Sequence, residues 1–257
     1  MTSPAMTAAL RVQGLGVCYG ALVALEDVSW EVSRGELLGI IGPNGAGKSS
    51  CYDAVSALIP RRGSVYLHGR DISRVPAHGL ARLGIKRAFQ QNAFFDQLTV
   101  RDNMVAALGG TASLGNSILR PLAAGRHAQA LREQAGDCLE RFGLPRESHG
   151  LRPHEISYGM QRMLSIALAY GAGAEVLLLD EPAAGLGGTD MTALTALLHS
   201  LKAEGVALVV IEHHMDLIMS VADRICVLNL GRPLACGTPA EIQRDPRVLQ
   251  AYLGGEQ

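Results

Sequence analysis

The stretch GPNGAGKS, residues 42–49, restricts the fold of this 257-residue chain more than any other feature. It follows the apolar run ELLGII, typical of a strand buried on both faces, and precedes SSCYDAVSALI, whose spacing is helical. Glycines at 42, 45 and 47 allow backbone N–H groups to turn towards one centre, and the N-terminus of the helix adds partial positive charge there. The stretch therefore predicts a loop that binds phosphate groups, of the form GxxxxGK[ST].

Two side chains of this loop carry the predicted chemistry. Lys48 would place a positive charge on the β- and γ-phosphates of a nucleotide, and the Ser49 hydroxyl would hold Mg²⁺. The alternative is a glycine-rich turn that caps a helix and binds nothing. Because a buried strand directly precedes the loop and a helix directly follows it, we favour the phosphate site.

Two carboxylates follow another buried strand, in LLLDEP at residues 177–182. Parallel-sheet enzymes place their sites at the carboxyl ends of strands, so Asp180 and Glu181 are expected to face the phosphate loop. Asp180 would hold Mg²⁺, directly or through water, and Glu181 would polarise a water for attack on the γ-phosphate. A simple turn at the end of the strand is the alternative.

Polar side chains end two further apolar segments. His213 follows the run VVIE and is placed to sense the γ-phosphate, whereas Glu212, His214 and Asp216 do not form a convincing zinc set with it by spacing. Gln90 lies where a sheet-like segment changes into a helical one. Its amide is a candidate ligand for Mg²⁺ or for the attacking water, although a glutamine at the end of a strand is by itself uninformative.

Composition excludes several classes of protein. The formal net charge of −1 lacks the excess of positive charge that is typical of a nucleic-acid-binding protein. No apolar run reaches the length of about 18 residues that a membrane span needs. The first residues lack a basic segment and a continuous apolar run, so we expect no secretory signal. The five cysteines are scattered and odd in number, which predicts small core residues rather than disulfides or a zinc site.

The order of patterns predicts an α/β fold. Alternating runs near the N-terminus predict antiparallel strands, and buried runs alternating with helical segments from residue 175 onwards predict a mostly parallel sheet. We expect one domain over residues 1–257, with a helical subdomain inserted over about 92–165 and a helical tail over about 236–257. Within the insertion, residues 111–125 are expected to form a loop and 126–144 an amphipathic helix.

The motifs together resemble a known family. In chain order they are VCYG, GPNGAGKS, Gln90, ISYGMQR, LLLDEP and IEHH, which look like the ATPase subunit of an ABC transporter. The resemblance covers essentially the whole chain, and the segments GIKRAFQQNAFFDQLTVRDN, DEPAAGL, IEHHM and AYLGGE are similar to the ATPases that serve uptake of branched-chain amino acids. The fold implied is a P-loop NTPase core with an N-terminal antiparallel β subdomain and a helical subdomain.

The resemblance implies a role for each matching residue. Tyr19 would stack on adenine, Glu181 would be the general base and His213 the switch. Ser157 and Gly159 would contact the γ-phosphate of ATP bound to the opposite subunit of a dimer. The phosphates would be wrapped by Gly42, Asn44, Gly45, Ala46, Gly47, Lys48, Ser49 and Ser50, and Mg²⁺ would be held by Ser49, Gln90 and Asp180.

The resemblance also implies partners and a place in the cell. An importer ATPase works on the cytoplasmic face of the membrane, with permease subunits, a second ATPase subunit and, indirectly, a secreted solute-binding protein. A soluble ABC-type ATPase acting on DNA or ribosomes is the first alternative. The segment between Gln90 and Ser157 is too short for the coiled coil of the DNA-repair type. A partner subunit that binds ATP without hydrolysing it is the second alternative, motivated by residues that depart from the usual family pattern, such as Met160 in the signature motif ISYGMQR.

Overall fold

The computed structural model describes residues 8–88, 94–109 and 121–253, with only the backbone of 121–127 and 253. The chain divides into two compact units, which are described separately. The first unit consists of residues 1–87, 175–183 and 198–257, and the second of residues 88–174 and 184–197.

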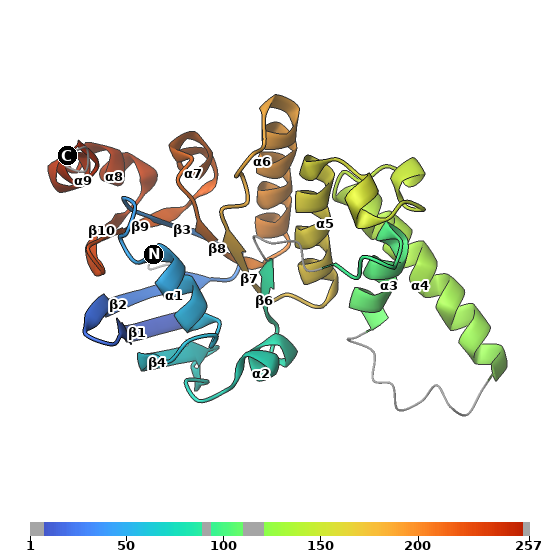
Figure 1. The fold of residues 1–257 in the computed structure, drawn as a ribbon, viewed down its shortest axis with the longest axis horizontal. Coiled ribbons are helices and arrows are strands. Elements are labelled where there is room, and N and C mark those ends of the chain that lie inside the picture. The colour runs from blue at the N-terminus through green and yellow to red at the C-terminus, as the bar shows by residue number, and fades with distance from the viewer. Residues whose placement is uncertain (1–7, 89–93, 110–120, 254–257) are drawn as a thin grey trace, which may run out of the picture. The chain divides into compact units, whose positions relative to one another are not determined.

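The first unit contains a four-stranded antiparallel sheet, as predicted. Its order is β2-β1-β4-β5, formed by β1 (Ala8–Tyr19), β2 (Leu22–Ser33), β4 (Arg62–Leu67) and the short β5 (Arg70–Asp71). Figure 1 shows β1, β2 and β4 side by side near α1 (Lys48–Val55), the helix that follows the phosphate loop. Apolar side chains of β1 and β2, such as Val12, Leu15 and Trp30, join the same buried core as Cys51 and Tyr52 of α1.

A six-stranded sheet of order β10-β9-β3-β8-β7-β6 supports the phosphate loop. Its strands are β3 (Leu37–Ile41), β6 (Ile85–Ala88), β7 (Val176–Asp180), β8 (Ala207–Ile211), β9 (Arg224–Asn229) and β10 (Arg232–Gly237). Strand β3 is parallel to both β8 and β9, and β7 is parallel to β8, whereas β10 is antiparallel to β9. Every residue of β3, β7 and β8 is buried, which explains their continuous apolar sequences.

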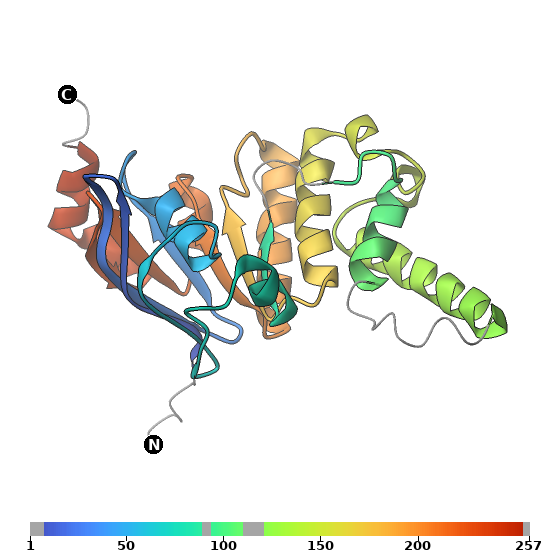
Figure 2. The same ribbon diagram turned by 60° about the horizontal axis from the view of Figure 1, so that its bottom comes forward.

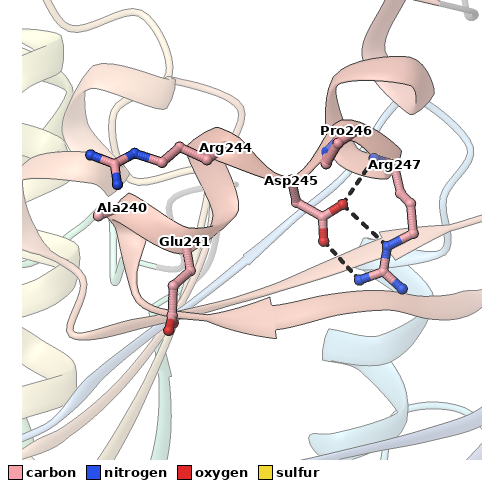
Figure 3. A pocket seen from close by; sticks show the side chains of 6 residues that line it. All are labelled: Ala240, Glu241, Arg244, Asp245, Pro246 and Arg247. Atoms are coloured by element: carbon pink, nitrogen blue, oxygen red, sulfur yellow. Dashed lines mark hydrogen bonds and ion pairs between the residues drawn. The ribbon is translucent and has the colours of Figure 1, made fainter.

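Shorter helices complete the first unit: α2 (Ala77–Arg82), α7 (Met215–Val221), α8 (Pro239–Arg244) and α9 (Pro246–Leu253). Thr238 caps α8 by accepting a hydrogen bond from the Glu241 N–H. Between α8 and α9, Asp245 accepts hydrogen bonds from the backbone and side chain of Arg247 (Figure 3), which lower the pKa of Asp245 to about 2. This local pair holds the start of α9 close to the end of α8.

The second unit is helical. It contains α3 (Val100–Gly109), α4 (Pro121–Arg141), α5 (Tyr158–Gly171) and two 3₁₀ turns, Arg146–Ser148 and Pro153–Glu155, while α6 (Gly188–Ala203) begins in this unit and ends in the first. Helices α3, α4 and α5 pack on one another (Figures 1 and 2). The predicted cap of α5 is confirmed, because the Ser157 hydroxyl accepts a 3.2 Å hydrogen bond from the Met160 N–H.

Two expectations from the sequence are wrong. Residues 121–125 are helical rather than loop, because proline suits the first turn of a helix and a single glycine at 125 is tolerated. Cys226 and Cys236 form a disulfide, although the cysteine pattern predicted none. The two face each other on neighbouring strands, a pairing that depends on the register of β9 and β10. Of the remaining cysteines, Cys51 is buried in the core as expected, whereas Cys18 is exposed and Cys138 is only partly buried, so the expectation of core residues is wrong for these two.

None of the helices in the described ranges is long and apolar enough to cross a membrane.

Candidate nucleotide-binding site

The phosphate loop connects β3 to α1 in the arrangement that the sequence predicts. The Lys48 ammonium group donates hydrogen bonds to the backbone oxygens of Gly42, at 2.6 Å, and Pro43, at 2.9 Å. The hydroxyl-bearing residues Ser49 and Ser50 lie in the first turn of α1, where the helix dipole favours anions. The loop therefore presents a lysine and a helix N-terminus at the carboxyl end of a central strand.

Two glycines of the loop are required by close backbone contacts. A Cβ on Gly42 would lie 2.1 Å from the Leu228 carbonyl oxygen. A Cβ on Gly47, the residue that precedes α1 with φ 95°, would lie 2.7 Å from the Ala24 carbonyl oxygen. The loop is thus packed against β9 and against β2, and its path leaves no room for side chains at these positions.

The turn between β9 and β10 also bonds to the loop. The Gly231 N–H donates to the Ala46 carbonyl at 3.1 Å, and the Gly231 carbonyl accepts from the Glu26 N–H at 2.8 Å. In the C-terminal helix, burial raises the pKa of Tyr252, and the backbone of Gly42 acts in the opposite direction. The loop conformation is therefore supported by chain segments far away in the sequence.

Lys48 is partly removed from water, and its charge is balanced by acidic neighbours. Burial lowers the pKa of Lys48, and the carboxylates of Glu181 and Asp180 act in the opposite direction. The structure thus brings together the lysine of the loop and the two carboxylates of LLLDEP, as the sequence predicted.

Asp180 and Glu181 follow each other at the end of β7. Asp180 is the last residue of the strand and is 9% exposed. Glu181 has a φ of 46°, a left-handed conformation that is rare for a residue with a side chain, and its N–H donates to the Ile211 carbonyl at 2.8 Å. Strained backbone of this kind is common at functional positions, which supports a chemical role for Glu181.

His213 lies beside Glu181, after the end of β8. Its Nδ1 is 3.5 Å from the Glu181 Oε1, and its side chain is half-exposed. His214 stacks at an angle on His213, with 4.6 Å between the ring centroids. The histidine ring and the carboxylate therefore lie next to each other, although they follow different strands.

Glu212, which the sequence suggested only as a poor metal ligand, positions this region. It is fully buried, and its carboxylate accepts hydrogen bonds from the N–H groups of Ala183 at 2.7 Å, His213 at 2.8 Å and His214 at 3.0 Å. Ligand atoms of Glu212, His213 and His214 lie within 4.8 Å of one another, but both Glu212 oxygens are already engaged. Glu212 thus connects the segments that follow β7 and β8. The sequence feature that could have indicated this role is a charged residue directly after an apolar run.

Tyr19 presents an aromatic face near the loop. It ends β1, is 49% exposed, and its hydroxyl lies 3.4 Å from the Ser50 Oγ. An exposed aromatic ring beside a phosphate site suits stacking on a base.

The donor set suits Mg²⁺, which prefers oxygen ligands. Ser49 lies in the first turn of α1 and Asp180 ends β7, so a hydroxyl and a carboxylate belong to two elements of the first unit that contact each other. Gln90, the third predicted ligand, lies outside the described residues.

The second unit holds Ser157 and Gly159, the residues predicted to contact ATP on the opposite subunit. Ser157 caps α5 with its oxygen, so its O–H remains able to donate to an anion. Gly159 lies in the first turn of α5, where a Cβ would come within 2.3 Å of an Asp190 carboxylate oxygen. The helix N-terminus formed here is a second place suited to a phosphate group.

A family model described as ABC transporter matches residues 25–184, more than half of the chain. The chain belongs to the ABC transporter family. Its members' ATPase fold accounts for the loop, the carboxylates and the helical unit, and the chain is accordingly an ATP-binding ABC ATPase.

Curated relatives extend this assignment over nearly the full length. The chain is 37% identical over 249 residues to the high-affinity branched-chain amino acid transport ATP-binding protein LivG of Salmonella typhimurium, covering 95% of this chain and 97% of the relative. It is 33% identical over 252 residues to the lipopolysaccharide export system ATP-binding protein LptB of Acidithiobacillus ferridurans, covering 98% and 99%. A second family model, for branched-chain amino acid ATP-binding cassette transporters, matches residues 232–257.

Solved structures agree with the fold. The ADP conformation of an ATP-binding cassette of an ABC transporter aligns with a TM-score of 0.81 at 27% identity, covering 96% of this chain and 99% of the other. A dimeric bacterial ABC transporter cassette aligns with a TM-score of 0.77 at 23% identity, covering 90% and 98%, which supports the fold alone. The predicted ABC ATPase fold class is confirmed.

Proposed function

We propose that this ABC ATPase hydrolyses ATP to drive an importer of branched-chain amino acids or of a similar amino acid or amide. Hydrolysis is supported chiefly by the left-handed Glu181 at the end of β7, with His213 and Lys48 around it. The cargo class is supported by the similarity to LivG and by the match of residues 232–257 to the branched-chain amino acid cassette model.

In this proposal the first unit binds the nucleotide. Tyr19 stacks on adenine, and the loop residues Gly42, Asn44, Gly45, Ala46, Gly47, Lys48, Ser49 and Ser50 wrap the phosphates through N–H groups, the ammonium and hydroxyls. Ser49, Gln90 and Asp180 would hold Mg²⁺, which supplies positive charge to the phosphate oxygens when bound. Lys48 adds a second positive charge, so that negative charge developing during phosphoryl transfer is balanced.

Water activation is assigned to Glu181, which accepts a proton from the attacking water. His213, 3.5 Å from the Glu181 carboxylate, orients the water and the γ-phosphate. Glu212 positions both residues indirectly, since it binds the backbone of His213 and of Ala183. Ser157 and Gly159 bind the γ-phosphate of ATP on the opposite subunit, through the Ser157 O–H and the N-terminus of α5.

We also propose the assembly. Two ATPase subunits, identical or different, close over two ATP molecules on the cytoplasmic face of the membrane and bind permease subunits. The helical subdomain over about residues 92–165, within the single domain 1–257, contacts the permeases, and the tail over about 236–257 belongs to the nucleotide unit. A secreted binding protein delivers the solute to the permeases.

The Glu181→Gln variant tests the proposed hydrolysis. We expect it to bind ATP as tightly as the unchanged chain but to lose turnover, measured by phosphate release with Mg²⁺. Glu175→Gln is the matched control, because Glu175 lies before β7 at the other end of the strand and pairs with His68. Turnover that survives in Glu181→Gln would contradict the role of Glu181, and an unchanged chain that binds ATP without hydrolysing it would favour the non-catalytic alternative.

The cargo is tested separately. Uptake of labelled leucine, isoleucine and valine is measured in cells in which this chain is native, with and without Lys48→Ala. Uptake that does not depend on Lys48 would contradict the cargo without affecting the proposed hydrolysis.

A further inference from the structure

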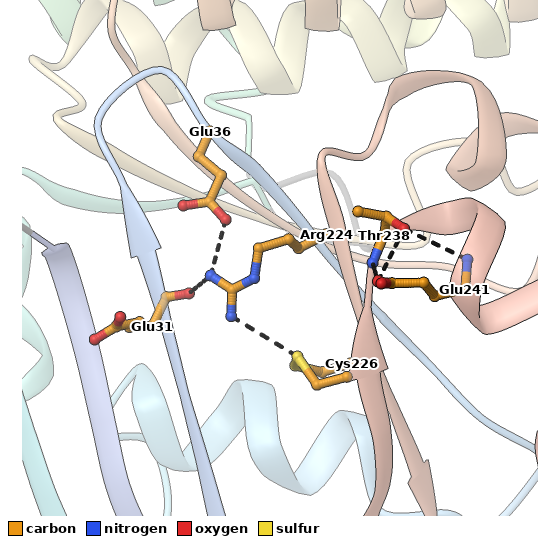
Figure 4. The surroundings of a disulfide bond; sticks show 7 residues. Glu31, Glu36, Arg224, Cys226, Thr238 and Glu241 are labelled. Atoms are coloured by element: carbon orange, nitrogen blue, oxygen red, sulfur yellow. Dashed lines mark hydrogen bonds and ion pairs between the residues drawn. A yellow bond between two sulfur atoms is a disulfide. The ribbon is translucent and has the colours of Figure 1, made fainter. Parts of the chain in front are cut away.

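The Cys226–Cys236 disulfide lies in the hairpin that supports the phosphate loop. The two cysteines are direct partners in the antiparallel pairing of β9 and β10. Figure 4 shows the surroundings of the bond. The two cysteines are separated by 10 positions in the sequence. The segment that the bond closes contains the turn residues Leu230 and Gly231. A covalent link at this point restricts how far the two strands of the hairpin move apart.

The two sulfur atoms differ in their exposure to solvent and in the charged groups near them. Cys226 is 5% exposed and belongs to the core, whereas Cys236 lies on the exposed edge strand β10. The Arg224 guanidinium lies 3.8 Å from the Cys236 Sγ and also pairs with Glu36 (Figure 4). A nearby cation stabilises a thiolate, so Cys236 is the sulfur suited to attack and to leave in exchange with small thiols.

The hairpin is in direct contact with the phosphate loop. In the pairing of β3 with β9, Ile40 is the partner of Cys226 and Ile41 the partner of Val227, and the loop begins at the next residue. The Leu228 carbonyl fills the space beside Gly42, and the Gly231 N–H bonds to Ala46. The conformation of the loop therefore depends on where β9 and its turn are held.

We propose that Cys226 and Cys236 form a reversible thiol–disulfide site that reacts with low-molecular-weight thiols and disulfides and sets the ATP affinity of the phosphate loop. The oxidised hairpin holds the loop in the binding conformation, and the reduced hairpin has more freedom, so that ordering the loop costs binding free energy. The coupling rests on the proposed function of the loop, and on the cytoplasmic location, where disulfides are commonly redox-sensing rather than structural.

The exchange reaction balances in two steps. The Cys236 thiolate attacks a small disulfide RSSR, forming a mixed disulfide with Cys236 and releasing one RS⁻. The Cys226 thiolate then attacks the Cys236 sulfur, forming the protein disulfide and releasing the second RS⁻. The two protons of the protein thiols are taken up by the two RS⁻, so that two protein thiols and RSSR give one protein disulfide and two RSH.

The first experiment maps the site in the full-length chain. The protein is equilibrated with mixtures of oxidised and reduced glutathione, alkylated, and analysed by peptide mass spectrometry. We expect Cys226 and Cys236 to gain and lose labelling together as the mixture changes. A stable glutathione adduct on Cys236 with Cys226 still labelled, or a pair that never changes, would overturn the site.

The second experiment measures ATP affinity by titration in both states. We expect the dissociation constant of ATP to be about fivefold higher after reduction, a modest coupling between linked sites. Cys236→Ser should show the reduced value in both conditions, and Cys226→Ala, which removes the other sulfur, should do the same. Cys18→Ser, a change at an exposed cysteine outside the hairpin, should keep the response.

Equal ATP affinity in the two states, with the disulfide formed, would overturn the coupling while leaving the proposed function intact. Absence of ATP binding in both states would contradict the proposed function and the coupling together, and the mapping experiment would still report whether the thiol–disulfide pair forms.

Discussion

The His213 Nδ1 lies 3.5 Å from the Glu181 Oε1, although the two residues follow different strands. The backbone maintains this relationship, because the Glu181 N–H bonds to Ile211 of β8 and Glu212 binds the N–H of His213. The parallel pairing of β7 and β8, in which Asp180 is the partner of Ile211, places both loops at one edge of the sheet. A carboxylate and a histidine are thus brought together by sheet register.

From this relationship we predict that His213→Ala lowers ATP turnover by about 10²-fold, the usual size of a lost contribution to proton transfer and positioning. ATP binding should change little, since Lys48 and the loop remain. Phosphate release and nucleotide titration measure the two effects. His214→Ala is the matched control because it removes the adjacent ring, and an equal loss of turnover in that control would contradict a specific role for His213.

The lowered pKa of Lys48 predicts that ATP affinity falls as pH rises. Burial depresses the pKa of the free site, so above that value the lysine is neutral and the phosphates lose a cation. Bound phosphate restores the charged form, and binding should therefore take up a proton in the alkaline range. Calorimetry over about pH 7 to 10, in buffers of different ionisation enthalpy, measures the proton uptake.

Lys48→Arg is the control for this pH dependence. Arginine stays protonated over the same range, so the slope of affinity against pH should disappear even if overall affinity is lower. A slope that is the same in Lys48→Arg would show that another group titrates.

The contact between Gly42 and Leu228 predicts that Gly42→Ala disrupts the phosphate loop. A Cβ at 2.1 Å from a backbone carbonyl cannot be relieved by rotating a side chain, so β9 or the loop must shift. We expect a loss of stability of about 1–3 kcal/mol, measured by denaturant unfolding, together with weaker ATP binding.

Gly45→Ala is the comparison, since no heavy atom lies within 4 Å of a Cβ there and only its φ of 78° opposes the change. It should destabilise less, by about 1–2 kcal/mol. A greater loss for Gly45→Ala than for Gly42→Ala would show that the contact with Leu228 is unimportant.

The Ser157 cap predicts two separable effects. Ser157→Ala should lower stability by about 1 kcal/mol through loss of the hydrogen bond from Met160, and Ser157→Thr should retain the cap. Ser157→Arg should leave ATP binding unchanged but stop hydrolysis at the facing site of a dimer, because a bulky cation occupies the proposed γ-phosphate position. Loss of ATP binding in Ser157→Arg, measured by titration, would indicate a structural role only.

The sequence by itself determined the phosphate loop, the carboxylates of LLLDEP, the histidine after β8 and the cap of α5. These features are local: a buried strand, glycines at set positions and a helix start are encoded within about ten neighbouring residues. The order of such motifs also determined the family and the α/β fold class, which the comparisons confirm.

Tertiary structure alone decided the features that depend on register and long-range packing. The Cys226–Cys236 pair depends on which residues of β9 and β10 are opposite each other, and a shift of one residue would separate them. The buried Glu212 binds the Ala183 N–H, 29 residues away in the sequence, and the Gly231 N–H bonds to the Ala46 carbonyl of the phosphate loop. Such contacts join segments whose proximity is set by the packing of the whole unit, so no local pattern encodes them.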